Sequence, residues 1–308
     1  MQNINCIMIG APVDSGKHRK GCVIGPDAYR TANLPQALDD LGYTVTDIGN
    51  LMVKPSASAS GPDISTELSQ TIGWTKRLAE VGLDAFINGL PIFLGGDHAL
   101  SLGSGLAAAR HAQHCGRPQH ILWLDAHSDF HTPETTMSGN LHGTPLAYLT
   151  GRNGFSDFPQ NDAPVPDQQV CILGLRSVDQ AEKTALQQSK IQLYDMRAID
   201  EQGIKRPLQA FLDQVKANNG LLHVSLDVDF LDPSVAPAVG TSGPGGATIR
   251  EAHLVMEILY DSGLMSSLDL VELNPFLDER GRTAQVMVDL AASALGRRVF
   301  DRPTQGYF

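Results

Sequence analysis

The sequence predicts an α/β fold in which a parallel β-sheet is covered by helices on both faces, and two observations support this. Apolar runs bounded by Gly, Pro, Asn and Asp alternate along the chain with amphipathic segments of helix length. Several runs, such as 221–226 and 268–271, are apolar at consecutive positions, which is typical of strands buried on both faces. The helical segments between such runs supply the crossovers that a parallel sheet needs.

The expected elements follow one another in β-α-β order. Strands are expected at 4–9, 43–47, 91–95, 120–125, 169–174, 190–194, 221–227 and 267–273. Helices are expected at 64–88, 99–113, 201–217, 249–262 and 283–296. The Ser- and Ala-rich stretch from Pro55 to Pro62 is interpreted as a surface loop, and we find no composition break long enough for an interdomain linker.

Composition and charge exclude several classes of protein. The 308 residues are 42% hydrophobic and 19% charged, close to the average for globular proteins, so disordered and fibrous chains are excluded. The formal net charge of −11 argues against a nucleic-acid surface, which is typically a basic stripe. The amino terminus lacks a basic region and a long apolar run, and the four cysteines have no C-x-x-C spacing. We therefore expect reduced thiols, no membrane span and a cytoplasmic location.

Three short clusters of acidic and histidine residues each follow an apolar run. They are Gly95–His98, Asp125–Asp129 and Asp227–Asp229. Because each cluster follows an expected strand, all three should emerge at the same edge of the sheet, where open α/β folds place their chemistry. Donors two residues apart on an extended chain point the same way, so both donors of a pair can face one point.

These clusters predict a site for two divalent cations. Four carboxylates gathered without compensation would repel one another and be partly protonated, whereas two divalent cations neutralise them. Oxygen-rich ligation completed by two imidazoles suits Mn²⁺ better than Zn²⁺. The alternative is that these side chains only cap helices or satisfy turns, an explanation that suits any one of them better than all six. The predicted ligands are His98, Asp125, His127, Asp129, Asp227 and Asp229.

At these residues the sequence resembles the ureohydrolase family, and the arginases within it, over most of the chain from Leu94 to Gly296. The resemblance rests on long motifs in the family's order: GGDHALSLG (95–103), WLDAHSDF (123–130), MSGNLHG (137–143), GLRSVD (174–179), SLDVDFLDPSVAPAVGT (225–241) and VELNP (271–275). It implies a single three-layer α/β/α domain over residues 1–308, with an eight-stranded, mostly parallel sheet. It also implies a homotrimer or homohexamer.

The resemblance further implies how the site works. One manganese ion would be held by His98, Asp125, Asp129 and Asp227, and the other by Asp125, His127, Asp227 and Asp229, with Asp125 and Asp227 bridging. A hydroxide bridging the two ions would attack the guanidinium of L-arginine, which yields L-ornithine and urea. His142 matches the family's proton-shuttling histidine, and the near-neutral pKa of histidine suits protonation of the departing amine. Asp129 is counted with the catalytic residues as well as with the ligands.

Substrate binding is expected to involve residues on several loops. Glu272 ends the apolar run 268–271, so its carboxylate should reach the same edge and accept a paired hydrogen bond from a guanidinium. Otherwise Glu272 is a helix-capping or surface acid, and His142 a loop histidine satisfied by the backbone. The other contacts that the resemblance implies are His131, Thr136, Ser138, Asn140, Asp179, Glu182 and Thr241.

Two positions depart from the family pattern. His131 stands where arginases commonly carry Asn, and Ser177 stands where many carry Asp. A histidine can still donate to an α-carboxylate, but it could shift selectivity towards another guanidino acid.

Three other functions stay open on the sequence. Agmatine, guanidinobutyrate or formiminoglutamate would suit the same metal site, although agmatine lacks the carboxylate that donors at Ser138 and Asn140 would satisfy, so arginine ranks first. An inactive, metal-stabilised arginine-binding protein is a second class, and such proteins usually lose ligands that are all present here. A zinc-dependent amide deacetylase of similar architecture fits the two-metal ligand count less well.

Overall fold

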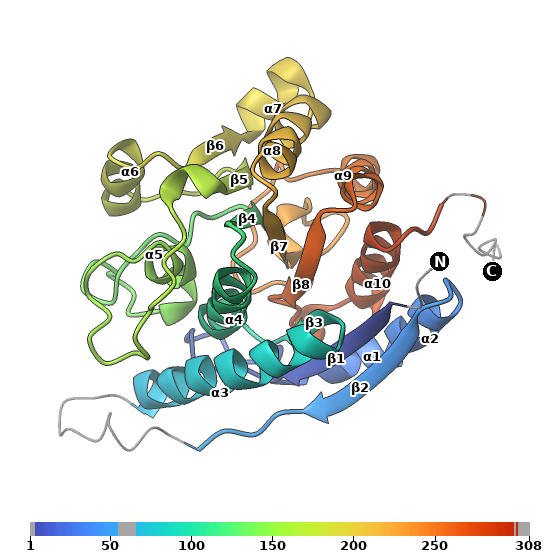
Figure 1. The fold of residues 1–308 in the computed structure, drawn as a ribbon, viewed down its shortest axis with the longest axis horizontal. Helices are drawn as coiled ribbons and strands as arrows, with labels where there is room; N and C mark the ends of the chain where they lie inside the picture. The colour runs from blue at the N-terminus through green and yellow to red at the C-terminus, as the bar shows by residue number, and fades with distance from the viewer. Residues whose placement is uncertain (1–3, 55–65, 299, 301–308) are drawn as a thin grey trace.

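The computed structural model describes residues 4–54, 66–298 and 300, and its strands form one sheet (Figure 1). The strands are β1 Asn5–Ala11, β2 Thr44–Asn50, β3 Leu90–Gly95, β4 Gln119–Leu124, β5 Val170–Leu175, β6 Gln192–Asp195, β7 Leu221–Asp227 and β8 Met265–Val271. All eight predicted strands are confirmed. Their order across the sheet is β2-β1-β3-β8-β7-β4-β5-β6, and every neighbouring pair is parallel.

Helices connect the strands, as expected for a parallel sheet. Within the described residues they are α1 Gly25–Thr31, α2 Leu34–Asp39, α3 Thr66–Asn88, α4 Ser101–His114, α5 Pro145–Leu149, α6 Gln180–Gln187, α7 Met196–Gln202, α8 Lys205–Ala217, α9 Ile249–Ser262 and α10 Arg282–Ala294. The predicted loop Pro55–Pro62 and the predicted helix start at residue 64 lie outside the described residues. None of the helices described is both long and apolar enough to cross a membrane.

One predicted helix needs correction. The expected helix 201–217 is two helices, since α7 ends at Gln202 and α8 begins at Lys205. The break lies at Gly203, whose φ of 74° is incompatible with a continuing right-handed helix. The short helices α1, α2, α5 and α6 were not predicted, because one or two turns carry too few apolar positions to show a helical period.

The sheet is the middle layer of an α/β/α sandwich. Alternate side chains of a strand point to opposite faces, and in β1 Cys6 and Met8 join a hydrophobic cluster with α9 and α10. Ile7 and Ile9 join a second cluster with α3 and α4. Figure 1 shows these two pairs of helices on opposite sides of the strands. Because apolar packing covers both faces, polar chemistry is left to the edges where the strands end.

The four central strands deliver the predicted clusters to one edge. In the order β3-β8-β7-β4 they are neighbours, and all four run in the same direction. The chain leaves β3 towards His98, β4 towards Asp125 and β8 towards Glu272, while Asp227 is the last residue of β7. The expectation that all three clusters share one edge is therefore confirmed, and Glu272 lies at that edge as well. That residues 1–308 form one domain stays a prediction.

Candidate metal and substrate site

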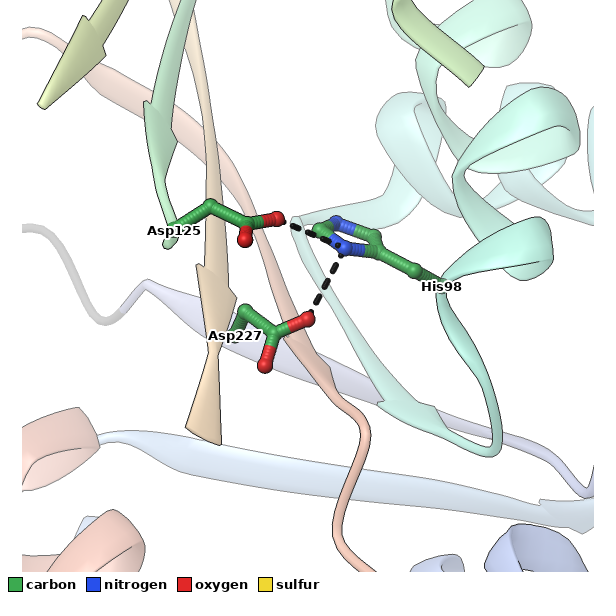
Figure 2. Close-up of side chains that lie close together, drawn as sticks. All are labelled: His98, Asp125 and Asp227. Carbon is green, nitrogen blue, oxygen red and sulfur yellow. Dashed lines mark ion pairs between the residues drawn. The ribbon is translucent and has the colours of Figure 1, made fainter. Parts of the chain in front are cut away.

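One nitrogen of His98 faces three carboxylates. Its Nδ1 lies 3.1 Å from Asp125 Oδ2 and 3.0 Å from the Oδ2 atoms of both Asp129 and Asp227. Figure 2 shows the carboxylates of Asp125 and Asp227 pointing at the imidazole from two different strands. All four side chains are buried. One nitrogen and three oxygens from three separate parts of the chain thus converge on one point.

These converging atoms lack protein partners of the right geometry. Among the described residues, His98 Nδ1, Asp125 Oδ2 and Asp129 Oδ2 are buried and make no hydrogen bond. A buried polar atom left unsatisfied costs roughly 1–3 kcal/mol, more if it is charged, so three that face one another need a common partner. Carboxylate oxygens with one imidazole are donors that a hard divalent cation prefers. The donor set therefore fits a metal ion.

The ring of His98 is held in place from behind. Its Nε2 hydrogen-bonds Ser225 Oγ at 2.8 Å, and its face stacks on Trp123 with ring centroids 4.2 Å apart and planes 1° from parallel. When Nε2 donates to the serine, Nδ1 keeps its lone pair and points it at the carboxylates. The ring is thus oriented as a ligand.

A second group of donors lies beside the first. His127 Nδ1 is 3.1 Å from Asp229 Oδ2 and 3.4 Å from Asp125 Oδ1, and one donor atom of each of these three residues lies within 4.8 Å of the others. Asp125 therefore offers one oxygen to each group, as a bridging ligand would. Asp227 reaches the first group through Oδ2, and its part as a second bridge stays a prediction.

The carboxylates divide their oxygens between the backbone and the site. The Oδ1 atom of Asp125 accepts from the His127 amide at 2.6 Å, and that of Asp227 accepts from the Asp229 amide at 2.7 Å. Asp229 Oδ1 accepts from the Ala126 amide at 3.0 Å. The alternative that these residues satisfy turns is thus correct for one oxygen of Asp125 and one of Asp227, whereas Asp229 Oδ1 links the loop after β7 to the loop after β4. Their second oxygens remain directed at the donor groups.

The backbone is strained at two positions of this edge. Asp129 has a φ of 47° and Glu272 a φ of 67°, a left-handed conformation that residues other than glycine seldom adopt. Such a conformation costs about 1–3 kcal/mol and persists only where surrounding contacts impose it. Both residues are buried, so the surrounding packing can hold this conformation.

Burial and mutual repulsion act on the carboxylates of the cluster. Burial, reinforced by the charge of Asp125, raises the pKa of Asp129 to about 6. Burial and then the charges of Asp229 and Asp125 raise the pKa of Asp227 well above its ordinary value. Burial alone would lower the pKa of His127, but its hydrogen bonds with Asp125 and Asp229 raise it to about 12. Cations bound here would relieve this repulsion and compete with protons for the same donors.

Glu272 sits next to this cluster and is fully engaged. Its Oε1 accepts from the His98 amide and from His142 Nδ1, both at 2.9 Å, and its Oε2 is ion-paired with Lys17 Nζ. Burial alone would raise the pKa of Glu272, but Lys17 and His142 lower it well below its ordinary value. Burial alone would lower the pKa of His142, and Glu272 raises it instead. Glu272 is buried, so it is not a surface acid, but its bond from the His98 amide caps the start of the 3-10 helix His98–Leu100, so the helix-capping alternative is correct for Oε1. The His142 ring bonds Glu272 rather than the backbone.

Lys17 is the site residue that sequence reasoning missed. It lies in the stretch Gly16–Gly21, whose three other interior residues are exposed, and it is itself buried. A run of basic residues in a loop is typical of a solvated surface, so no local signal distinguishes Lys17 from Lys20. Its partner Glu272 is 255 residues away along the chain.

A cavity of about 200 Å³ opens beside the donor groups. Four predicted ligands line it, namely His98, His127, Asp129 and Asp227, together with His142. Six of the eight predicted substrate residues also line it: His131, Thr136, Ser138, Asn140, Glu182 and Thr241. Asp179 and Glu272 are not part of the lining. The metal donors and most of the predicted substrate residues therefore share one cavity.

His131, Asp179 and Glu182 form a linked group at one side of this cavity. His131 Nε2 is 3.0 Å from Asp179 Oδ2, and its Nδ1 is 3.2 Å from Thr135 Oγ1. Asp179 also caps α6 through Oδ1, and Glu182 Oε1 accepts from Ser128 Oγ at 2.5 Å. These acids therefore tie the loop after β4 to α6, a structural role that the sequence did not indicate.

Comparison with known proteins gives a consistent result. A family model described as the arginase family matches residues 4–296. An arginase of Brucella melitensis biotype 1 is 56% identical over 306 residues, which covers 99% of this chain and 100% of that protein. An arginase of Agrobacterium fabrum is 54% identical over 304 residues, covering 98% and 94%. The crystal structure of arginase from Bacillus subtilis has a TM-score of 0.87 and 35% identity, covering 96% of this chain and 99% of that one.

Proposed function

The chain belongs to the arginase family, and on this premise we propose that it hydrolyses L-arginine to L-ornithine and urea. Membership of the family makes it a hydrolase acting on linear amidine carbon–nitrogen bonds. The observation that carries the proposal is the convergence of three carboxylate oxygens on His98 Nδ1, where the nitrogen and the oxygens of Asp125 and Asp129 make no hydrogen bond among the described residues.

The two donor groups would hold two Mn²⁺ ions. His98, Asp125, Asp129 and Asp227 would bind one ion, and Asp125, His127, Asp227 and Asp229 the other. When bound, two such cations lower the pKa of water and so supply a nucleophile at neutral pH, which a resonance-stabilised guanidinium requires. The four carboxylates balance the charge of two divalent ions.

His142 would carry the proton that the leaving amine needs. Its Nδ1 donates to Glu272 Oε1 at 2.9 Å, so the charged carboxylate stabilises the imidazolium form. The ring lines the cavity, and its second nitrogen, Nε2, would exchange the proton with the amine. Glu272 would thus orient His142 and, as predicted, accept from the substrate guanidinium.

The amino-acid end of the substrate would lie against the loop that follows β4. Thr136, Ser138 and Asn140 line the cavity with hydroxyl and amide groups that can donate to an α-carboxylate. Agmatine has no carboxylate, so these donors would be left without partners if it bound. Asp179 would act on the α-amino group only if it separated from His131, to which it is now paired.

A substrate panel tests the proposal directly. The Mn²⁺-loaded enzyme is assayed with arginine, agmatine, guanidinobutyrate and formiminoglutamate, with detection of urea and formamide. We expect kcat/KM for arginine to exceed that for agmatine by about 10²-fold or more, because buried donors discriminate strongly. Urea from agmatine and not from arginine, or tight arginine binding without urea, would contradict the proposal.

The homotrimer or homohexamer and the cytoplasmic location also stay predictions. Light scattering would test the oligomeric state.

A further inference from the structure

Both oxygens of Glu272 are already occupied in the free chain. Two N–H groups donate to Oε1, from the His98 backbone and the His142 ring, and the Lys17 ammonium pairs with Oε2. Glu272 is only 1% exposed. A substrate guanidinium that approaches Glu272 therefore meets a carboxylate that an internal cation has neutralised.

The Lys17 ammonium lies behind the wall of the substrate cavity. The side chain is 3% exposed, and its Nζ also lies 2.9 Å from Cys22 Sγ. A Cβ placed on Gly240 would lie 3.4 Å from Nζ, and the next residue, Thr241, lines the cavity. The ammonium is thus close to the space that the substrate would enter.

The loop that carries Lys17 is tied to the loop that carries the predicted substrate contacts. The His18 amide donates to Asn140 Oδ1 at 3.1 Å, and the His142 amide donates to the Gly16 carbonyl at 2.9 Å. These contacts involve the two residues on either side of Lys17, so they fix the position of the Lys17 backbone relative to the site. The ammonium can leave the carboxylate only through rotation of its own flexible stem.

We propose that Lys17 determines substrate affinity as an internal cation that competes with the substrate guanidinium for the Glu272 carboxylate. The inference rests on the proposed function, because it takes Glu272 as the guanidinium acceptor. The substrate must either displace the ammonium from a buried ion pair or bind beside it against like-charge repulsion. Either cost falls on the bound substrate and on the transition state alike, so it raises KM and leaves kcat largely unchanged.

The test compares three variants of the Mn²⁺-loaded protein. Lys17→Met removes the charge at similar size, Lys17→Arg replaces it with a permanent guanidinium, and Lys20→Met is the matched control. Lys20 lies in the same loop but is exposed, and its Nζ donates to the Asp14 carbonyl at 2.6 Å. The measurements are KM and kcat for arginine, the Kd of guanidinium chloride by calorimetry, and metal content.

Lys17→Met should lower KM for arginine and the Kd of guanidinium by about tenfold or more, with kcat within about threefold, because the like charge that opposes the guanidinium is removed. Lys17→Arg should raise both constants, and Lys20→Met should change neither. A folded, metal-loaded Lys17→Met with unchanged or weaker guanidinium binding overturns the inference, as does a fall in kcat at constant KM. If Lys17→Met does not fold, wild-type KM in Lys17→Arg overturns it.

Failure of the proposed function has a separate signature. It appears in the wild-type protein as absence of urea from arginine, whereas the comparison of guanidinium binding between wild type and variants needs no turnover. The two hypotheses can therefore fail independently.

Discussion

The two carboxylate oxygens of Asp125 have different partners. One oxygen accepts from the His127 amide and holds the turn after β4, while the other points at His98. Asp227 repeats the pattern after β7, with one oxygen on the Asp229 amide. Asp125 and Asp227 therefore each shape their own loop and still direct a second oxygen at His98, so replacing either removes a turn contact and a predicted ligand together.

Asp227→Ala should abolish manganese binding and activity together. The substitution removes a donor of the His98 group and would leave the remaining buried atoms without their shared partner. Metal content by elemental analysis and urea release by steady-state assay check this. Asp213→Ala, on the exposed face of α8, is the control and should leave both unchanged. A variant that kept two ions per chain would refute the ligand assignment.

His142→Asn should leave the metal content intact and lower kcat by about 10²–10⁴-fold, the usual contribution of a general acid. The ring contacts Glu272 and lines the cavity, but it is not one of the converging donors. Elemental analysis and kcat measured on the same preparation separate the two effects. Loss of manganese in this variant would mean that the residue acts as a ligand rather than as a proton carrier.

His131→Asn should improve arginine binding. The substitution breaks the contact to Asp179 Oδ2, which leaves that carboxylate available to an α-ammonium group. We expect a lower KM for arginine, an unchanged kcat and a higher ratio of kcat/KM for arginine over agmatine. An unchanged ratio would show that the His131 to Asp179 pair does not influence selectivity.

At the scale of elements, a buried polar network joins β7, β8 and α4 beneath the metal donors. Asp269 Oδ2 on β8 accepts from Ser101 Oγ at 2.7 Å and from Ser104 Oγ at 2.6 Å, and Ser101 lies 3.5 Å from Ser225 Oγ on β7. Ser225 in turn contacts His98. The network also includes His223 of β7, whose Nε2 lies 3.2 Å from Asp269 Oδ2, and it connects the position of His98 to the packing of the sheet.

Ser225→Ala should weaken manganese binding about 10–100-fold, the usual effect of removing a hydrogen bond to a metal-ligating histidine, while the fold is retained. Competition with a chelator measures the affinity, and circular dichroism measures the fold. Ser267→Ala is a matched control, because its hydroxyl contacts His223 in the same sheet but not His98. Equal affinity in wild type and Ser225→Ala would show that Trp123 stacking alone orients the ring.

Elements with a clear apolar pattern were predicted from the sequence, whereas a helix break and a helix cap were not. Apolar runs predicted all eight strands. Burial on both faces leaves a local mark in the six inner strands, whereas the edge strands β2 and β6 are largely exposed and were found from shorter runs bounded by turn residues. The division between α7 and α8 at Gly203 escaped prediction, because a single glycine inside a helical pattern does not by itself end a helix. The capping role of Asp179 also escaped, since a Ser, Asp or Glu in a loop suits both a cap and a substrate contact.

At the scale of the whole molecule, strand order decides which residues meet. β8 and β7 are inserted between β3 and β4, so His98 and Glu272, 174 residues apart, become neighbours. The site therefore depends on the complete sheet. Uncompensated charge at the site should in turn lower the stability of the whole folded chain.

Removing the metal should destabilise the entire protein. With the cations absent, buried carboxylates repel one another, and a ligand that binds only the folded chain at 100 times its Kd stabilises it by about 2.7 kcal/mol. We therefore expect the Tm to fall by several degrees after chelation and to rise again with added Mn²⁺ in a concentration-dependent way. The His142→Asn variant should show the same dependence. A Tm that changes neither after chelation nor after addition of manganese would contradict a metal site in this cluster.

The sequence by itself determined the strands, the three donor clusters and the family. Apolar periodicity and donor spacing are local properties, so they can be recognised in short stretches of sequence without knowledge of the fold. Only the tertiary structure decided which oxygen of each carboxylate faces the site, and that Lys17 rather than Lys20 is buried against Glu272. The physical reason is that an ion pair spanning 255 residues is selected by the packing of the whole sheet, which leaves no mark on either local sequence.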